Sequence, residues 1–217
     1  MADMKILMVL TNHKDVDEGR STGVWLEEFA VPYETFQDKG YEVTVVSPKG
    51  GEVPVDPNSE SDNWPGAKDL LKDTKPLDSV EGSEYDAIFL PGGHGTMFDF
   101  PDNETLKKLL AEFYEDEKVV SAVCHGPAGF TEVKLSDGSP LVSGKTITAF
   151  TDSEESGTGL EDAMPFLLES QLREQGANFV VKPDYSDHVE RDGHLITGQN
   201  PPSSQSTALA VIEALES

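Results

Sequence analysis

The stretch KVVSAVCHGPAGF, residues 118–130, is the most informative part of the amino-acid sequence. Its first half is short, continuous and rich in valine, which is typical of a strand covered on both faces of a parallel sheet. Cys124 ends this strand, and Gly126 permits a tight turn directly after it. We therefore expect a nucleophile elbow after a central strand, a sharp turn into a helix that presents Cys124 beside His125.

Similar apolar runs recur along the chain and alternate with helical patterns. The expected strands cover residues 5–10, 41–47, 85–92, 118–124, 146–150 and 178–181. The expected helices cover residues 23–39, 103–115, 160–175 and 203–215. Such an alternation predicts an α/β fold of the doubly wound, flavodoxin-like kind, with a mainly parallel sheet and helices on both faces.

The whole chain, residues 1–217, is expected to form a single domain, because no repeat and no linker divides it. Residues 48–82 are polar and rich in Gly, Pro, Asp and Ser, and they predict a long excursion on the surface of that domain. Asp192-Gly193 predicts the turn of a hairpin.

Acidic residues dominate the charge of the chain. Asp and Glu number 41 against 16 Lys and Arg, so the formal net charge is -25. A field of this sign repels nucleic acid and anionic membranes, and neither is expected as a partner. No apolar run approaches the roughly 18 residues of a membrane span, and no signal peptide is expected. The single cysteine excludes an internal disulfide and fits a reducing cytoplasm.

Three polar or glycine-rich junctions follow expected strands: GGHGT at 92–96, CHGPAG at 124–129 and TDSEES at 151–156. Ligands of doubly wound proteins bind beyond the carboxyl ends of the strands, so these junctions predict the place of the site. In the first junction, the Gly93 N–H is a candidate donor to an oxyanion, together with the N–H of His125.

Cys124 is the candidate nucleophile. A cysteine at a strand end is more often a small buried hydrophobe, but its neighbours here favour reactivity. A helix that begins near Gly126 would direct its positive end at the sulfur and lower the pKa of the thiol. His125 would supply a base of suitable pKa.

Glu28 is the candidate acid near the sulfur. Its neighbours three and four positions away on the expected helix are apolar, so its carboxyl would be desolvated and would keep its proton. The alternative is a partly exposed acid on a very acidic protein, and spacing alone does not separate Glu28 from Glu27.

Neither a metal nor an organic cofactor is expected. His13 and His194 lack partners at metal-ligand spacing, and the GGHG segment lacks the last glycine of a dinucleotide motif because position 98 is Phe. His188 and Glu190 have the His-x-Glu spacing of glutamine amidotransferases, but their place on the expected hairpin predicts exposure.

The segment AVCHGPAGF (122–130) resembles the DJ-1/PfpI superfamily, relatives of the class I glutamine amidotransferases. The similarity covers nearly the whole chain and includes residues 22–36, 91–101, 144–155 and 192–208. The chain looks most like the chaperone-like, glutathione-independent glyoxalases, also described as glyoxalase III, D-lactate dehydratase or protein/nucleotide deglycase. This resemblance implies a cofactor-independent cysteine enzyme, a small dicarbonyl such as methylglyoxal as the substrate, and a homodimer.

The resemblance also implies roles for individual residues. Cys124 would be the nucleophile, His125 the base, Glu155 the acid that orients His125, and Glu28 the acid near the sulfur. The alternatives to Glu155 are Glu154 and Asp152.

Other functions fit the same residues. A cysteine peptidase or amidase would use Cys124 and His125 on acyl substrates and would ignore dicarbonyls. A non-enzymatic stress chaperone would need an exposed apolar patch, and a redox sensor would oxidise Cys124. A glutaminase subunit is the least favoured, because its His-x-Glu pair would be misplaced.

We expect folding to depend on salt, because the acidic residues are spread over the whole chain and screening weakens their mutual repulsion. The midpoint of thermal unfolding, followed by circular dichroism, should rise steadily between dilute buffer and molar NaCl. A midpoint that does not respond to salt would contradict this adaptation to concentrated salt.

Overall fold

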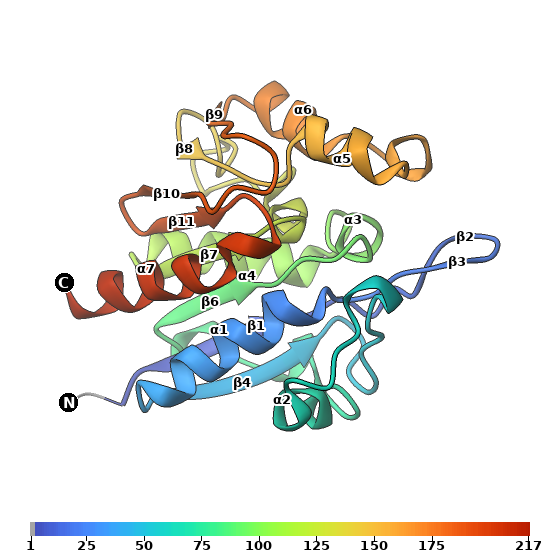
Figure 1. The fold of residues 1–217 in the computed structure, drawn as a ribbon. Coiled ribbons are helices and arrows are strands. Elements are labelled where there is room, and N and C mark those ends of the chain that lie inside the picture. The colour runs from blue at the N-terminus through green and yellow to red at the C-terminus, as the bar shows by residue number, and fades with distance from the viewer. Residues whose placement is uncertain (1–2) are drawn as a thin grey trace.

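A computed structural model describes residues 3–217 of the chain. The strands of its main sheet are β1 (Lys5–Val9), β4 (Glu42–Ser47), β5 (Lys75–Pro76), β6 (Ala87–Leu90), β7 (Val119–Val123), β10 (Val189–Asp192) and β11 (Leu195–Gly198). They are arranged in the order β10-β11-β7-β6-β1-β4-β5 (Figure 1). All neighbours are parallel except β10 and β11, which form an antiparallel hairpin. The predicted mainly parallel α/β sheet is confirmed.

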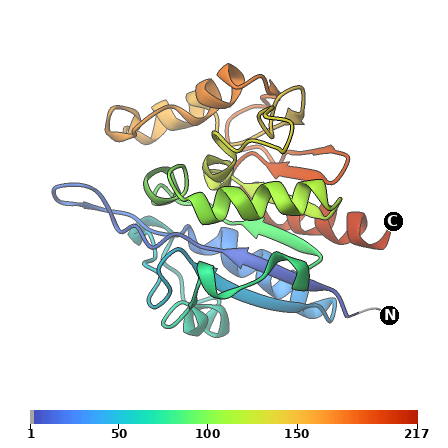
Figure 2. The ribbon, with the colours of Figure 1, turned by 180° about the vertical axis from the view of Figure 1, so that it is seen from behind.

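Helices cover both faces of this sheet. Helices α1 (Leu26–Asp38) and α7 (Ser204–Glu216) lie side by side on the face turned to the viewer in Figure 1. Helix α4 (Glu104–Glu115) covers the other face, which Figure 2 shows from behind. The shorter helices are α2 (Pro65–Leu70), α3 (Thr96–Asp99), α5 (Asp152–Thr158) and α6 (Leu168–Glu174).

Strand β7 shows why the apolar residues of 118–124 form a nearly continuous run instead of alternating with polar ones. All five of its residues are buried. Val120 and Ala122 belong to the apolar cluster that includes α4, whereas Val119 and Val123 belong to the cluster that includes α1 and α7. Because successive side chains of a strand point to opposite faces, a strand with helices on both sides is mostly apolar. The one polar side chain of β7, Ser121, donates a hydrogen bond to the Ile88 carbonyl at 2.7 Å.

Two of the predicted strands are wrong as members of the main sheet. Residues 146–150 and 178–181 form only the short strands β8 (Thr146–Ile147) and β9 (Asn178–Phe179), which pair with each other. Their apolar character comes from packing, because Ile147 and Phe179 are buried in the same cluster as α4. The main sheet is completed instead by the hairpin β10–β11, whose turn was predicted.

The helix predicted over residues 160–175 forms only in its second half, as α6. Helix α5 begins earlier, because Thr151 and Glu154 form a capping box in the segment expected to be a polar junction. Gly159 ends α5 with a φ of 73°, in the left-handed region. Pro165 then disfavours helix in the residue before it, and α6 starts only at Leu168.

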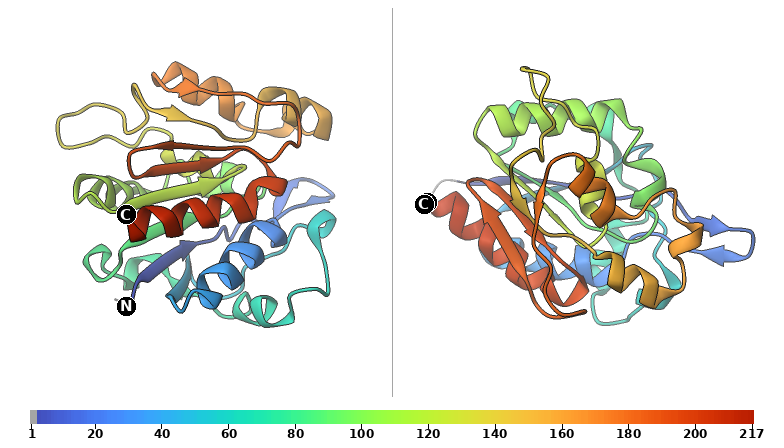
Figure 3. Two further views of the ribbon diagram at one scale, coloured as in Figure 1. Left: turned by 60° about the vertical axis from the view of Figure 1, so that its left-hand side comes forward. Right: turned by 90° about the horizontal axis from the view of Figure 1, so that it is seen from above.

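The expected surface excursion, residues 48–82, carries structure of its own. It contains α2 and the edge strand β5, which pairs with β4. Val53, Ala67 and Leu71 are buried in the apolar cluster that includes α1, whereas Leu77 is buried in the cluster that includes α4. A second hairpin, β2 (Asp15–Asp17) with β3 (Arg20–Ser21), projects from the body of the molecule in Figures 1 and 2 and in the right-hand view of Figure 3. Within residues 3–217, no helix combines the length and apolar character that crossing a membrane requires.

Replacing a buried residue of α4 should destabilise the fold far more than replacing an exposed one. Leu110 is 0% exposed, so L110A should lower the free energy of unfolding by about 2–5 kcal/mol through the cavity it leaves. Lys108 on the same helix has a largely exposed side chain, and K108A should change that free energy by less than about 0.5 kcal/mol. Urea unfolding at constant salt measures both. Equal effects of L110A and K108A would contradict the assigned packing of α4.

Candidate active site

Cys124 lies directly after β7 on a strained backbone. Its φ is 61°, in the left-handed region that non-glycine residues seldom adopt. Two backbone hydrogen bonds hold it there: the Cys124 N–H donates to the Gly198 carbonyl at 3.0 Å, and the Cys124 carbonyl accepts from the Phe150 N–H at 2.9 Å. Strain of this kind is retained where the surrounding structure imposes it, typically at functional sites. The predicted sharp turn after a central strand is therefore present.

Gly126 allows this turn to pass very close to β6. A Cβ atom at Gly126 would lie 2.1 Å from the carbonyl oxygen of Leu90, which no other residue type could tolerate without a shift of the backbone. The residues that follow, Gly126–Phe130, form a 3-10 helix of little more than one turn.

The expected lowering of the thiol pKa is wrong. Cys124 is only 3% exposed, and burial raises its pKa well above the usual range. An ionised Glu28 would raise this pKa further, and the short 3-10 turn takes the place of the expected helix. The resting side chain is therefore a thiol, and it needs a base to become a nucleophile.

His125 is placed to be that base. Its Nδ1 lies 3.6 Å from the sulfur of Cys124, and its Nε2 lies 2.9 Å from Oε1 of Glu155. An ionised carboxylate can only accept hydrogen bonds, so Nε2 carries the proton of the neutral ring and Nδ1 is left free to accept one. Burial lowers the pKa of His125, which keeps the ring neutral.

Glu155 is the centre of a buried polar cluster. It accepts hydrogen bonds from His125, from Nε2 of His94 at 2.7 Å and from the hydroxyl of Thr158 at 2.9 Å. Burial opposes ionisation, but His125 and His94 outweigh it and hold the pKa of Glu155 well below its usual range. The carboxylate is therefore ionised at any pH at which the protein is expected to work.

The two alternatives to Glu155 have other partners. Glu154 is fully buried and accepts hydrogen bonds from Thr151, Tyr185, Gln199 and Asn200. Asp152 accepts from the hydroxyl of Ser170. Glu155 alone of the three acids lies against His125.

Glu28 is buried as expected. It is 0% exposed, and its Oε1 accepts a hydrogen bond from the Gly92 N–H at 2.8 Å. Within residues 3–217, its Oε2 is buried and has no hydrogen-bond partner. Burial raises the pKa of Glu28 well above its usual range, so it holds a proton beside the sulfur. Glu27, the alternative, is only partly buried.

The N–H groups of Gly93 and His125 are the expected oxyanion donors. Neither has a hydrogen-bond acceptor among residues 3–217. The two backbone segments adjoin each other, because a Cβ atom at Gly92 would lie 2.7 Å from the nitrogen of His125. Gly93 has a φ of 103°, and a Cβ atom there would lie 2.1 Å from the carbonyl oxygen of Gly23.

His94 is the site residue that the sequence analysis missed. Its segment was interpreted only as a source of backbone donors, yet the imidazole is 6% exposed and lies against His125, with the ring centroids 4.2 Å apart. A histidine inside a glycine-rich junction at the carboxyl edge of the sheet was the available signal. His188 lies on the side of the hairpin, where its Nε2 is 3.2 Å from Oε1 of Glu190. It was predicted to be exposed, but it is partly buried.

The same cluster contains the donor set of a possible metal site. One ligand atom each of His94, His125 and Glu155 lie within 4.8 Å of one another. In this arrangement both Nε2 atoms donate to the carboxylate, so a cation would have to displace two protons to bind.

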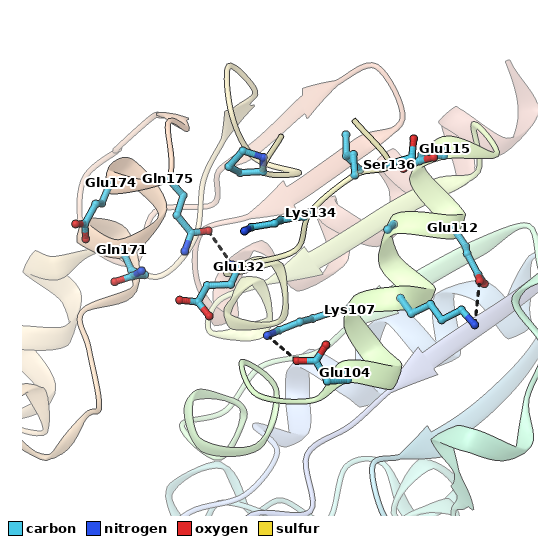
Figure 4. A pocket seen from close by; sticks show the side chains of 14 residues that line it. Glu104, Lys107, Glu112, Glu115, Glu132, Lys134, Ser136, Gln171, Glu174 and Gln175 are labelled. Carbon is cyan, nitrogen blue, oxygen red and sulfur yellow. Dashed lines mark hydrogen bonds and ion pairs between the residues drawn. The ribbon is translucent and has the colours of Figure 1, made fainter. Parts of the chain in front are cut away.

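A surface groove of about 950 Å³ lies away from this cluster (Figure 4). It is formed by α4, α6 and residues 131–140, and charged side chains predominate in its lining. Its Lys107 is paired with Glu104 at 3.3 Å. Cys124 does not line this groove, so the groove is not the site of the reactive cysteine.

Comparison with known proteins connects this geometry to a family. The model of the DJ-1/PfpI family matches residues 20–214. The protein named glutathione-independent glyoxalase HSP31 of Saccharomyces cerevisiae is 35% identical, and the alignment covers 100% of each chain. The crystal structure of glyoxalase III from Candida albicans has a TM-score of 0.90 at 34% identity and 97% coverage of each chain. That of Rapid Encystment Protein 24 kDa from Francisella tularensis has a TM-score of 0.93 at 36% identity, with 98% of this chain and 99% of that chain covered.

The family model spans nearly all of the chain, and these relatives align over almost their entire length. The chain belongs to the DJ-1/PfpI family.

Proposed function

We propose that this protein is a glutathione-independent glyoxalase, which converts methylglyoxal and water to lactate. One observation carries the proposal: the unprotonated Nδ1 of His125 faces the sulfur of Cys124, while Nε2 is held by Glu155. Relatives named glutathione-independent glyoxalases, which align over the whole chain, support it.

The first step makes a hemithioacetal. His125 accepts the proton of the Cys124 thiol at Nδ1, and the sulfur attacks the aldehyde carbon of methylglyoxal. The aldehyde oxygen becomes an oxyanion, accepts hydrogen bonds from the free N–H groups of Gly93 and His125, and then takes the proton from Nδ1. Methylglyoxal is small and uncharged, so its binding needs no cationic clamp.

The second step moves a proton between neighbouring carbons. Neutral His125 removes the proton from the former aldehyde carbon, which gives an enediolate, and returns it to the adjacent carbon while the hydroxyl proton on the former aldehyde oxygen moves to the neighbouring oxygen. The product is a thioester of lactate on Cys124. Water then attacks the thioester carbonyl, lactate leaves, and the sulfur recovers its proton.

Glu28 assists as a neutral acid. Its Oε2 is buried beside Cys124 without another partner among residues 3–217, so its proton can be donated to the sulfur or to a substrate oxygen. An ionised Glu28 would oppose thiolate formation by repulsion, whereas the protonated carboxyl stabilises the thiolate by donating a hydrogen bond.

The same cysteine chemistry would serve a deglycase, and the Cys–His pair would also serve an amidase. A deglycase would release lactate from adducts of methylglyoxal with amines or thiols, and an amidase would cleave amide reporters without affecting dicarbonyls. The reducing cytoplasm and the homodimer expected from the sequence stay predictions. A reduced compartment suits a reaction that begins with a free thiol.

Removing the sulfur should abolish lactate formation. C124A should lower the rate of glutathione-free lactate production from methylglyoxal by at least about a thousandfold, because no hemithioacetal can form. S136A, which changes an exposed residue in the remote groove, is the control and should keep the wild-type rate. Lactate is measured enzymatically in high salt, with amide reporters run in parallel. Lactate production by C124A at the wild-type rate would reject the mechanism, and turnover of the amide reporters alone would favour the amidase.

Glutamine should replace Glu28 better than alanine does. The glutamine amide is neutral and keeps a hydrogen-bond donor, so E28Q should retain at least about tenfold more of kcat/KM than E28A. Steady-state kinetics with methylglyoxal at pH 7 measures both. Equal losses in E28Q and E28A would show that the proton of Glu28 is not used.

The pH dependence of the free energy of unfolding of E28Q should also show that the Glu28 carboxyl is protonated in the folded protein. The pKa of Glu28 is higher in the folded than in the unfolded state, so the wild type loses stability as pH rises from the unfolded pKa of about 4.5 through the folded pKa. E28Q cannot lose that contribution, and its free energy of unfolding relative to the wild type should increase between pH 5 and pH 9. Urea unfolding at pH 5, 7 and 9 measures this difference. The control is E34Q, an exposed position on α1, for which the difference should stay constant.

A further inference from the structure

His94 reaches the catalytic carboxylate from a separate part of the chain. It belongs to the glycine-rich junction after β6, whereas Glu155 comes from α5 and His125 follows β7. Its Nε2 lies 2.7 Å from Oε2 of Glu155, and His125 occupies the other oxygen, Oε1, at 2.9 Å. Each oxygen of the carboxylate therefore has its own imidazole.

The position of His94 relative to His125 is built into the backbone. The buried hydroxyl of Thr96 lies 2.9 Å from the carbonyl oxygen of Gly93 and 2.9 Å from that of His125, so it connects the two segments. The His94 ring lies 4.2 Å from the ring of His125, and Phe150 flanks His125 at 4.4 Å. Neither imidazole can turn without disturbing this packing.

The hydrogen bonds determine which ring nitrogen carries the proton. Ionised Glu155 has acceptors only, so both imidazoles must present N–H to it. With Oε2 occupied by His94 and Thr158, Oε1 is available to His125 alone. Without the N–H of His94, only the Thr158 hydroxyl would hold Oε2, and the carboxylate could turn away from Nε2 of His125. The neutral ring of His125 would then lose the constraint that leaves Nδ1 unprotonated towards Cys124.

We propose that His94 is a positioning residue for the glyoxalase reaction: it donates to Oε2 of Glu155 and so keeps His125 in the tautomer that can take the thiol proton. The kinetic part of its test rests on the proposed function. The tautomer part does not.

Loss of His94 should change the pKa of His125 in a definite direction. Burial lowers the pKa of His125, and His94 lowers it further, whereas Glu155 and Glu154 raise it. Cys124, Glu28 and Tyr185 are further titratable groups beside this cluster, and burial raises the pKa of each, so all three keep their protons at rest. Loss of the His94 imidazole removes a contribution that lowers the pKa of His125, so this pKa should rise.

The variants H94Q and H94N test whether the hydrogen bond from residue 94 to Glu155 matters, or only the space that the side chain fills. The amide nitrogen of glutamine falls near the position of Nε2 and can still donate to Glu155. The amide of asparagine is one methylene shorter and cannot reach it. H94Q and H94N therefore carry the same amide group, but only H94Q can bring its amide nitrogen close enough to Glu155 to donate a hydrogen bond. H94F, which fills the space without a donor, replaces H94N if the smaller side chain prevents folding.

The first measurement is ¹⁵N NMR of the imidazoles in the full-length protein, with His125 assigned from the signals lost in H125N. Wild type and H94Q should show the tautomer with the proton on Nε2. H94N should show a mixture of tautomers and a titration midpoint raised by roughly 0.5–1 pH unit. An H94N spectrum and midpoint identical to those of the wild type would overturn the proposal.

The second measurement is the pH profile of kcat/KM for methylglyoxal. In H94N, kcat should fall about 10- to 100-fold with little change in KM, and the acidic limb should move to higher pH, because His125 stays protonated to a higher pH. H94Q should restore most of kcat. Equal losses in H94Q and H94N with an unmoved limb would mean that His94 only fills space, which would also overturn the proposal. Absence of lactate production by the wild type would reject the proposed function, and the NMR result alone would then decide the role of His94.

Discussion

The left-handed backbone at Cys124 is the constraint on which the site depends. A φ of 61° turns the chain sharply at the end of β7, and this turn points the sulfur away from the strand and towards His125. The strain is held by bonds to both sides: Gly198 accepts from Cys124 on the hairpin side, and Phe150 donates to it from the segment before α5. The same two segments carry Thr151, Gln199 and Asn200, whose side chains hold Glu154 in place. The reactive turn and its polar support are therefore one connected unit.

Two buried acids with opposite ionisation make the chemistry possible. Glu28 lies among apolar groups with a single N–H donor and keeps its proton, whereas Glu155 receives three donors and stays ionised. Residue type does not distinguish them; their surroundings do. In a chain with 41 acidic residues, the site is thus marked by the few carboxyls that lie away from water.

The fold was predictable from local signals, and the site only in part. Continuous apolar runs such as 118–124 identified the strands covered on both faces, because burial on two sides leaves little room for polar residues. The runs 146–150 and 178–181 are equally apolar, but they pack beside the sheet and do not join it, and periodicity cannot separate these cases. Cys124 and His125 were recognisable as neighbours in sequence. The link between His94 and Glu155 was not, because 61 residues separate them and only the tertiary fold brings them together.

The adjacency of Glu154 and Glu155 has a consequence for how this sequence can change over time. Glu154 anchors the start of α5, while Glu155, one position later, faces the imidazoles. Consecutive residues of a helix differ in direction by about 100°, so inserting one residue between Phe150 and Glu154 would put Glu154 in the position that faces the imidazoles. Deleting one residue there would put Glu155 in the anchoring position. Loops usually tolerate changes in length. We expect this short segment to be an exception, with its length preserved more strictly than its composition.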